Sequence, residues 1–214
     1  MENYVMENYE LVRRCSDYAA IAHLGQFRKD KKTPYIVHPA RVVSSIGICD
    51  PIVKCEAWMH DVIEDCSILC DSGEKIIRNH NNTFDNFLKS LEDIISSSEI
   101  MQMKRQIELL TKKKCLSKTI EEKKKNNTLN YKSIEGDGKD GTVLIKACDR
   151  IDNLPTAHSF SQDNFRYYIE DTLTLIGIIG DRLISLNSRI YQQLVSEYQN
   201  AKNRYRNLYP KDDI

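Results

Sequence analysis

Apolar residues recur at steps of three and four positions along most of this chain, which is the spacing of one buried face of an α-helix. The pattern is clear at Leu11, Cys15 and Ala19, and it returns over residues 143–154. Glycine and proline, which interrupt helices, number only 8 and 5 among 214 residues. The sequence therefore predicts an all-α fold.

The spacing also predicts where the helices lie. The expected helices cover approximately residues 7–24, 39–46, 51–62, 84–95, 99–116, 143–154, 162–197 and 198–208. Residues 25–33, 66–82 and 130–141 are polar and are expected to form loops, the last of them mobile. Because no internal repeat or Pro- or Ser-rich linker divides the chain, we expect one domain over residues 1–196. A C-terminal helix and tail over residues 197–214 is expected to pack on the same domain.

Composition excludes several classes of partner. The 31 basic and 31 acidic residues cancel, so nothing indicates bulk binding of nucleic acid or of an anionic membrane. The longest apolar run, within 173–179, is far shorter than the ~20 residues that span a bilayer. Seven cysteines without a CxxC pair, and an N-terminus without a cationic flank and apolar stretch, favour reduced thiols and no signal peptide. We expect a cytoplasmic protein with neither a nucleic-acid nor a membrane partner.

Residues 58–65 concentrate ionisable side chains beside the only tryptophan of the chain. They are His60, Asp61, Glu64 and Asp65. If a helix continues through them, His60 lies over Glu64 and Asp61 lies over Asp65. This pattern is typical of a catalytic or metal-binding site, but an exposed acidic helix end with a solvated histidine fits these residues equally well.

Two further side chains are difficult to explain without a ligand. His38 stands in an apolar setting, and Asp149 stands inside an otherwise apolar helix, where a bare carboxylate is costly to bury. A core histidine with satisfied hydrogen bonds, and a buried salt bridge from Asp149 to Arg150 or Lys146, are the alternatives. A divalent ion would account for both residues, and a mixed imidazole and carboxylate set suits Mn²⁺ better than it suits a thiolate zinc site. The four candidate ligands are His38, His60, Asp61 and Asp149.

Three segments, taken in order, carry a resemblance to a known family. They read Arg-Lys-Asp-Lys-Lys-Thr-Pro-Tyr-Ile-Val-His-Pro over 28–39, His-Asp-Val-Ile-Glu-Asp over 60–65, and Lys-Ala-Cys-Asp-Arg-Ile-Asp-Asn-Leu over 146–154. Together they resemble the hydrolase domain of the RelA/SpoT-homologue family, and most of all its stand-alone small alarmone hydrolases in the HD superfamily. The resemblance implies an all-α HD-domain helical bundle with a metal site between helices.

The resemblance also implies a role for each matched residue. The ligands of one Mn²⁺ ion would be His38, His60, Asp61 and Asp149. The acidic pair that positions and activates the attacking water would be Glu64 and Asp65. The contacts to the nucleotide and its phosphates would be Arg28, Lys29, Lys114, Asn153 and Tyr168. For Lys114, a solvated helix face with a run of lysines is an equally good interpretation.

The implied activity is release of pyrophosphate from the 3′ position of guanosine tetra- and pentaphosphate, which leaves GDP or GTP. Two alternatives stay open on the same residues. A related HD phosphohydrolase could act on a ppApp-type alarmone or on the 2′-phosphate of NADPH, and a non-catalytic protein could only bind the nucleotide. The expected partner is a small-molecule nucleotide, and a homodimer through the long C-terminal helices is possible. Segments 66–100 and 126–141 are longer than is usual in the family, which puts the choice of substrate in question.

Overall fold

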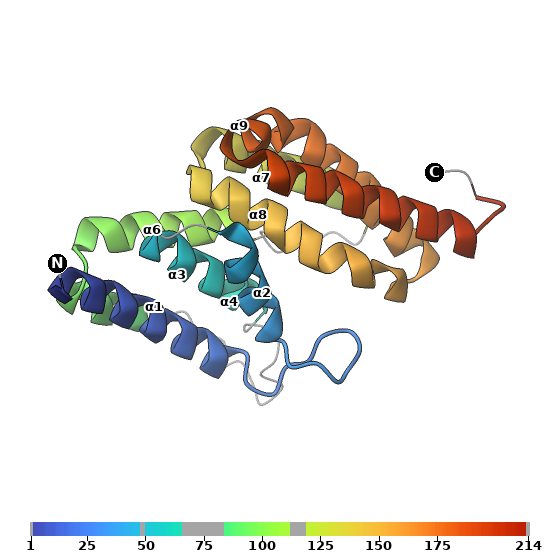
Figure 1. The fold of residues 1–214 in the computed structure, drawn as a ribbon. Helices are drawn as coiled ribbons and strands as arrows, with labels where there is room; N and C mark the ends of the chain where they lie inside the picture. The colour runs from blue at the N-terminus through green and yellow to red at the C-terminus, as the bar shows by residue number, and fades with distance from the viewer. Residues whose placement is uncertain (1, 48–49, 66–83, 112–118, 213–214) are drawn as a thin grey trace. The chain divides into compact units, whose positions relative to one another are not determined.

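A computed structural model describes residues 2–47, 50–65, 84–111 and 119–212 (Figure 1). Within these ranges the regular structure is helical, and the only β-type pairing is an isolated bridge between Phe27 and Pro34. The prediction of an all-α fold is confirmed for this part of the chain. In the same part, no helix is both long and apolar enough to cross a membrane. The chain forms two compact units, an N-terminal unit over residues 1–111 and a C-terminal unit over residues 112–214.

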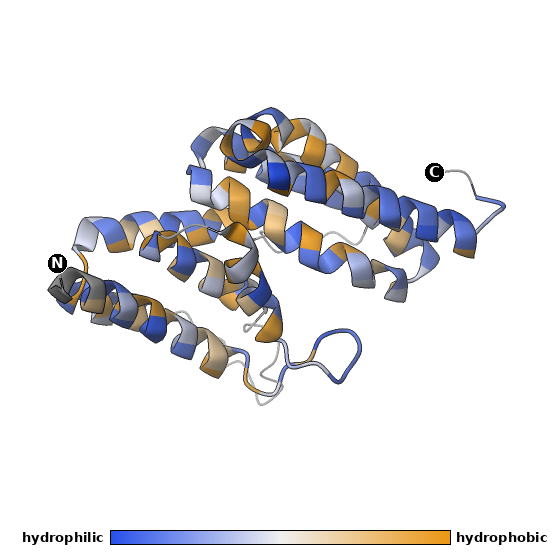
Figure 2. Ribbon diagram, in the orientation of Figure 1, coloured by the Kyte–Doolittle hydropathy of each residue, from blue (hydrophilic) through white to orange (hydrophobic). Residues whose placement is uncertain are grey.

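The N-terminal unit is built around helix α3. Its named elements are α1 (Glu2–Ala22), α2 (Val37–Ile46), α3 (Pro51–Met59), α4 (Val62–Asp65), the 3₁₀ helix η1 (Ser90–Asp93) and α6 (Ser97–Leu110). Helix α3 packs against α1, α2 and α6. The apolar core of this unit includes Leu11, Cys15, Cys55, Met59 and Met103. Figure 2 shows polar and apolar residues interleaved along these helices, as one buried and one exposed face require.

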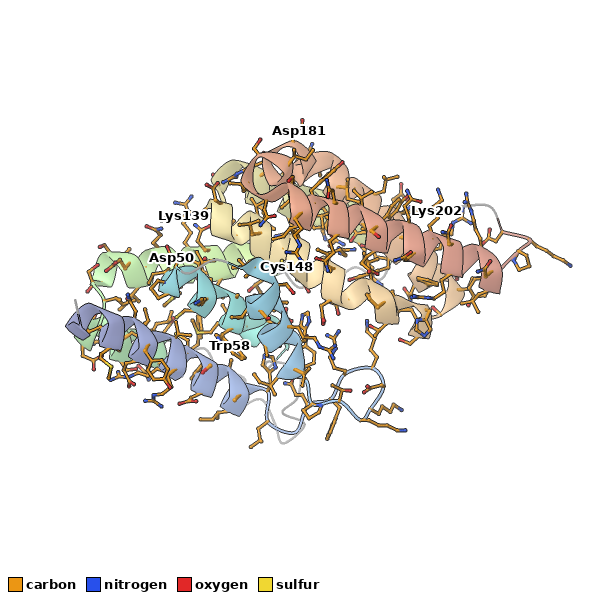
Figure 3. The ribbon with its side chains drawn as sticks, viewed as in Figure 1. Asp50, Trp58, Lys139, Cys148, Asp181 and Lys202 are labelled. Carbon is orange, nitrogen blue, oxygen red and sulfur yellow. The ribbon has the colours of Figure 1, made fainter. Side chains whose placement is uncertain are left out.

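Helix α3 begins where the sequence predicts it. The carboxylate of Asp50, labelled in Figure 3, accepts hydrogen bonds from the amides of Ile52 at 2.8 Å and Val53 at 3.3 Å. Pro51 occupies the first helical position, where a missing amide hydrogen costs nothing. The helix ends at Met59 and α4 begins at Val62, so the expected continuous helix is interrupted at His60 and Asp61.

In the C-terminal unit, the prediction of a loop over residues 130–141 is wrong. The polar composition predicts a mobile loop over residues 130–141, but α7 (Ile120–Asp137) runs through most of them. Tyr131 and Ile134, one turn apart, are fully buried and form the apolar face of this otherwise polar helix. The connection to the next helix is short and tight, because a Cβ at Gly138 would collide with the carbonyl oxygen of Ile134. Glycine at this position lets the chain turn directly into α8.

The remaining elements of this unit are α8 (Asp140–Asn153), the 3₁₀ helix η2 (Leu154–Ser159) and α9 (Gln162–Leu208). Helix α9 packs against each of the other elements of the unit, and its own backbone is non-helical at Asn187. There α9 folds back on itself, so the ring of Phe165 lies 5.5 Å from that of Tyr205. The amide oxygen of Asn187 caps the second arm by accepting a bond from the amide of Ile190. The sequence places this break near residue 197, about ten residues too late.

Candidate active site

Two histidine rings face each other in the interior of the N-terminal unit. His38 lies in the first turn of α2 and His60 follows the last residue of α3, and their Nε2 atoms are 3.3 Å apart. His38 is fully buried and His60 is 2% exposed. Because Nδ1 of His60 donates to the carbonyl oxygen of Ala57 at 2.8 Å, the neutral ring presents a bare Nε2 to its neighbour. Such a pair needs a proton or a cation between its two nitrogens.

Asp61 adds a carboxylate to the two rings. Its Oδ2 lies 3.1 Å from Nε2 of His60 and 3.4 Å from Nε2 of His38. Burial alone raises the pKa of this carboxyl group, but the adjacent His60 and His38 outweigh burial and hold the pKa well below its usual value. The group is therefore an anion. We call His38, His60 and Asp61 the histidine–aspartate cluster.

The spacing within the histidine–aspartate cluster fits a divalent cation. Two ligand atoms bound at about 2.1 Å to one ion lie about 3.0–3.4 Å from each other, depending on whether the coordination is octahedral or tetrahedral. The three donor atoms of the cluster are 3.1–3.4 Å apart. Imidazole nitrogen with carboxylate oxygen is a donor set that suits Mn²⁺, Fe²⁺, Zn²⁺ and similar ions. These residues could therefore hold a metal ion without rearrangement of their side chains.

Tyr35 is a site residue that the sequence analysis missed. Its hydroxyl donates a hydrogen bond of 2.8 Å to Oδ2 of Asp61, the oxygen that faces both histidines. Its ring lies 4.7 Å from the ring of His23 and 5.8 Å from that of His38. The only signal for it in the sequence is its place inside the 28–39 motif, because contact with Asp61 depends on the tertiary fold.

A short basic loop precedes Tyr35 and presents Arg28 and Lys29. The amide of Arg28 donates to the carbonyl of Thr33 at 2.8 Å, and Lys31 turns the loop in the left-handed region with φ 57°. The carboxylate of Asp30 accepts from the hydroxyl of Thr33 and from two loop amides, which lowers the pKa of Asp30 to about 2. The loop is therefore shaped by its own hydrogen bonds. Arg28 is half-buried and Lys29 is exposed.

In the C-terminal unit, Asp149 lies on α8 next to Cys148, which Figure 3 labels. Oδ2 of Asp149 accepts from Nζ of Lys146 at 3.1 Å, and Oδ1 accepts from Nδ2 of Asn153 at 2.6 Å. Of the two salt bridges considered from the sequence, the structure therefore contains the one to Lys146. Asn153, expected to contact the nucleotide, lies one turn from Asp149 and orients that carboxylate.

Arg150 points away from Asp149 and into a buried polar network. Its guanidinium donates to Asp171 at 2.7 Å, to the hydroxyl of Tyr131 at 2.6 Å and to that of Thr172 at 2.9 Å. It also lies 4.3 Å from the centre of the ring of Tyr168. Burial raises the pKa of Asp171, but Arg150 and the hydrogen bonds from Tyr131 and Asn127 together outweigh burial, so the pKa is lowered overall. The network ties α8 to α9 and supports Tyr168 from one side.

The structure thus groups the predicted site residues within each unit. His38, His60 and Asp61 form one cluster, and Asp149 with Asn153 forms another. The backbone of Glu64 and Asp65 is part of α4, but their side chains are outside the described part of the structure. Lys114 lies outside the described residues altogether. That Asp149 joins the histidine–aspartate cluster stays a prediction.

Proteins similar to this chain are found both by sequence and by fold. No protein-family model matches the chain. Over 189 residues it is 24% identical to a protein of Mycoplasma genitalium named probable guanosine-3′,5′-bis(diphosphate) 3′-pyrophosphohydrolase, covering 85% of this chain and 23% of that protein. Over 178 residues it is 22% identical to the GTP pyrophosphokinase of Myxococcus xanthus, covering 81% of this chain and 21% of that protein. The chain therefore spans less than a quarter of the length of these curated relatives.

A solved structure described as "A metazoan ortholog of SpoT hydrolyzes ppGpp and plays a role in starvation responses" is also similar to this chain. It superposes with a TM-score of 0.59 at 22% identity, over 89% of this chain and 94% of that chain. Helical folding together with a buried imidazole–carboxylate cluster is what the resemblance to an all-α HD-domain bundle predicts. In sequence and in fold the chain is similar to SpoT-type proteins, so the resemblance expected from its three motifs is confirmed.

Proposed function

We propose that this chain is a metal-dependent 3′-pyrophosphohydrolase of guanosine tetra- and pentaphosphate that acts in the cytoplasm. The observation that carries the proposal is the buried histidine–aspartate cluster, in which two ring nitrogens and an ionised carboxylate face one another at 3.1–3.4 Å. The names of the relative from Mycoplasma genitalium and of the structurally similar metazoan protein support the choice of reaction.

The proposed ion is Mn²⁺, and the proposed fourth ligand is Asp149. When bound, a divalent ion would polarise a phosphoryl oxygen and lower the pKa of the attacking water. Support for Asp149 comes from its position in the third motif and from Asn153 and Lys146, which hold both of its oxygens in place. A carboxylate that is oriented in this way resembles the hydrogen-bonded ligands of known metal sites.

The chemical step needs a base and neutralisation of charge. We assign the base to Glu64 or Asp65, whose carboxylate would take a proton from the water as its oxygen bonds to phosphorus. The bond from that phosphorus to the 3′ oxygen then breaks, and the 3′ oxygen leaves as a hydroxyl once it takes up the proton that the carboxylate accepted from the water. Arg28 and Lys29 would bind the phosphate groups, with Arg28 able to make two parallel hydrogen bonds to one phosphate. Lys114, Asn153 and Tyr168 are the further proposed substrate contacts.

The test is product analysis after incubation of the purified, Mn²⁺-loaded protein with ppGpp. We expect release of pyrophosphate and GDP, loss of activity in EDTA, and its return when Mn²⁺ is restored. Asp61→Ala should abolish turnover, because it removes one ligand and leaves the two histidines facing each other. A metal-loaded wild-type protein that leaves ppGpp intact would refute the proposal. Parallel assays of ppApp and NADPH decide whether guanine alarmones are the preferred substrates.

A further inference from the structure

We infer that Tyr35 is a positioning residue with two separable roles. Its hydroxyl orients Asp61 within the histidine–aspartate cluster, and its ring supports Arg28 at the base of the basic loop. The first role concerns metal binding alone. The second rests on the proposed function, because it concerns how the loop receives the phosphates of the substrate.

The hydroxyl acts on the carboxylate that completes the cluster. A carboxylate rotates readily about the bond to its β-carbon, so its oxygens need a partner to stay in one plane. Tyr35 supplies that partner through the 2.8 Å hydrogen bond to Oδ2 of Asp61. The same oxygen lies 3.1 Å from Nε2 of His60. Hydrogen bonds of this kind to ligating carboxylates tune metal sites, and their loss typically weakens metal binding about 10–100-fold.

The ring of Tyr35 is held in place from several sides. The ring of His23 packs against it at 4.7 Å with an interplanar angle of 30°, and the edge contact to His38 is at 5.8 Å. His23 is itself fixed by a 2.8 Å contact between its Nδ1 and the side-chain oxygen of Gln26. The amide of Tyr35 donates to the carbonyl of Gln26 at 2.9 Å. The phenol is therefore oriented by the protein rather than by a ligand.

Arg28, a proposed phosphate-binding residue, contacts the ring of Tyr35. Its guanidinium carbon lies over the ring of Tyr35, 5.8 Å from the ring centre, which is within the range of a cation–π contact. The backbone of Arg28 is fixed by its hydrogen bond to Thr33. Tyr35 thus touches a proposed metal ligand with its hydroxyl and a proposed phosphate-binding residue with its face. The two roles use different parts of one side chain, so two substitutions can separate them.

The hydroxyl is tested by Tyr35→Phe, with Mn²⁺ affinity measured by calorimetry in the absence of nucleotide. We expect affinity to fall about 10–100-fold. At saturating Mn²⁺, the KM for ppGpp should stay within about twofold of the wild type, because the ring under Arg28 is kept. Tyr9→Phe is the matched control: Tyr9 is 66% exposed on α1, and its substitution should change neither quantity. Wild-type Mn²⁺ affinity in Tyr35→Phe would overturn the role of the hydroxyl.

The ring is tested by Tyr35→Leu at saturating Mn²⁺. We expect the KM for ppGpp to rise about two- to fivefold further than in Tyr35→Phe, from the lost cation–π contact. In a double-mutant cycle with Arg28→Met, this increase should disappear, since the two side chains act as one unit. An unchanged KM, or a fully additive cycle, would overturn the role of the ring. If Tyr35→Leu fails to fold, Tyr35→Met with Arg28→Met repeats the cycle.

These outcomes are distinct from a failure of the proposed function. If the wild type binds Mn²⁺ but leaves ppGpp intact, the substrate assignment fails. In that case, weaker Mn²⁺ binding by Tyr35→Phe still supports the role of the hydroxyl, and equal binding still contradicts it.

Discussion

At the scale of single residues, the tautomer of His60 determines what the histidine–aspartate cluster can do. The ring is 2% exposed, and its Nδ1 is committed to the carbonyl oxygen of Ala57. Only Nε2 is then left to face His38 and Asp61. A hydrogen bond from the far ring nitrogen fixes the orientation of the ring and raises the basicity of the ligand nitrogen. The hydrogen bond to the carbonyl oxygen of Ala57 therefore leaves Nε2 of His60 oriented to bind a cation.

The proposed catalytic role of the acidic pair Glu64 and Asp65 can be tested by substitutions that keep the size of each side chain. We expect Glu64→Gln or Asp65→Asn, whichever removes the base, to lower kcat about 10²–10⁴-fold with little change in KM. Mn²⁺ affinity should stay near the wild-type value, because neither residue is a proposed ligand. Steady-state kinetics with ppGpp and calorimetry with Mn²⁺ measure both effects. Glu108→Gln on the exposed face of α6 is the control, and wild-type kcat in both acidic variants would contradict the assignment.

Part of the site could be predicted from residue type and order alone. His38, His60 and Asp61 stand out because imidazole and carboxylate groups in apolar or clustered settings indicate a ligand. Tyr35 could not be found in this way. Its partner Asp61 is 26 positions away, and a tyrosine between Pro34 and Ile36 looks like any half-buried aromatic residue.

At the scale of helices, the pair Arg150–Asp171 fixes α8 to α9. Both side chains are at most 3% exposed, and the distance between them is 2.7 Å. Removing one partner of a buried pair leaves the other charge without compensation. We expect Arg150→Met to lower the free energy of unfolding by about 3–5 kcal/mol in urea denaturation.

The double variant Arg150→Met, Asp171→Leu tests the cause of that loss. It should recover much of the lost stability, because no buried charge is then left uncompensated. Arg189→Met, on α9, is the control for loss of an arginine away from this network. Equal instability of the single and double variants would show that packing, rather than the unpaired charge, explains the effect.

The same pair predicts a dependence of stability on pH. The pKa of Asp171 is lowered in the folded protein: burial raises it, but Arg150 and the hydrogen bonds from Tyr131 and Asn127 together lower it more. The stabilisation is therefore complete above the unfolded value of about 3.9 and is lost as pH falls from there through the folded pKa. The difference in unfolding free energy between wild type and Asp171→Asn should be largest at about pH 6 and should shrink as the pH falls below about 3.9. A difference that stays constant over that range would contradict the assignment.

Helix prediction succeeded where buried faces are regular and failed where they are sparse. Asp50 and Pro51 predict the start of α3 correctly, because capping chemistry is local. Helix α7 was missed because only two of its 18 residues, Tyr131 and Ile134, are both buried and apolar. The break at Asn187 was misplaced because residues on both sides of it continue the helical spacing.

At the scale of the whole molecule, the three motifs are divided between two compact units. The histidine–aspartate cluster lies in residues 1–111, and Asp149 lies in residues 112–214. The order of the motifs along the chain was enough to predict the similarity to SpoT-type proteins that the comparisons find. That order holds no information on whether Asp149 lies near the histidine–aspartate cluster. The proposed link is that Asp149 binds the same metal ion as the histidine–aspartate cluster.

Mn²⁺ binding by purified variants tests this link. Calorimetry on the wild type should give one Mn²⁺ per chain, and both His38→Ala and Asp149→Ala should weaken binding about 100-fold or more. Asp181→Ala, an exposed carboxylate of the same unit as Asp149, should bind as the wild type does. If Asp149→Ala retained one Mn²⁺ with wild-type affinity, the two units would not share the ion, and the proposed metal site would be contradicted.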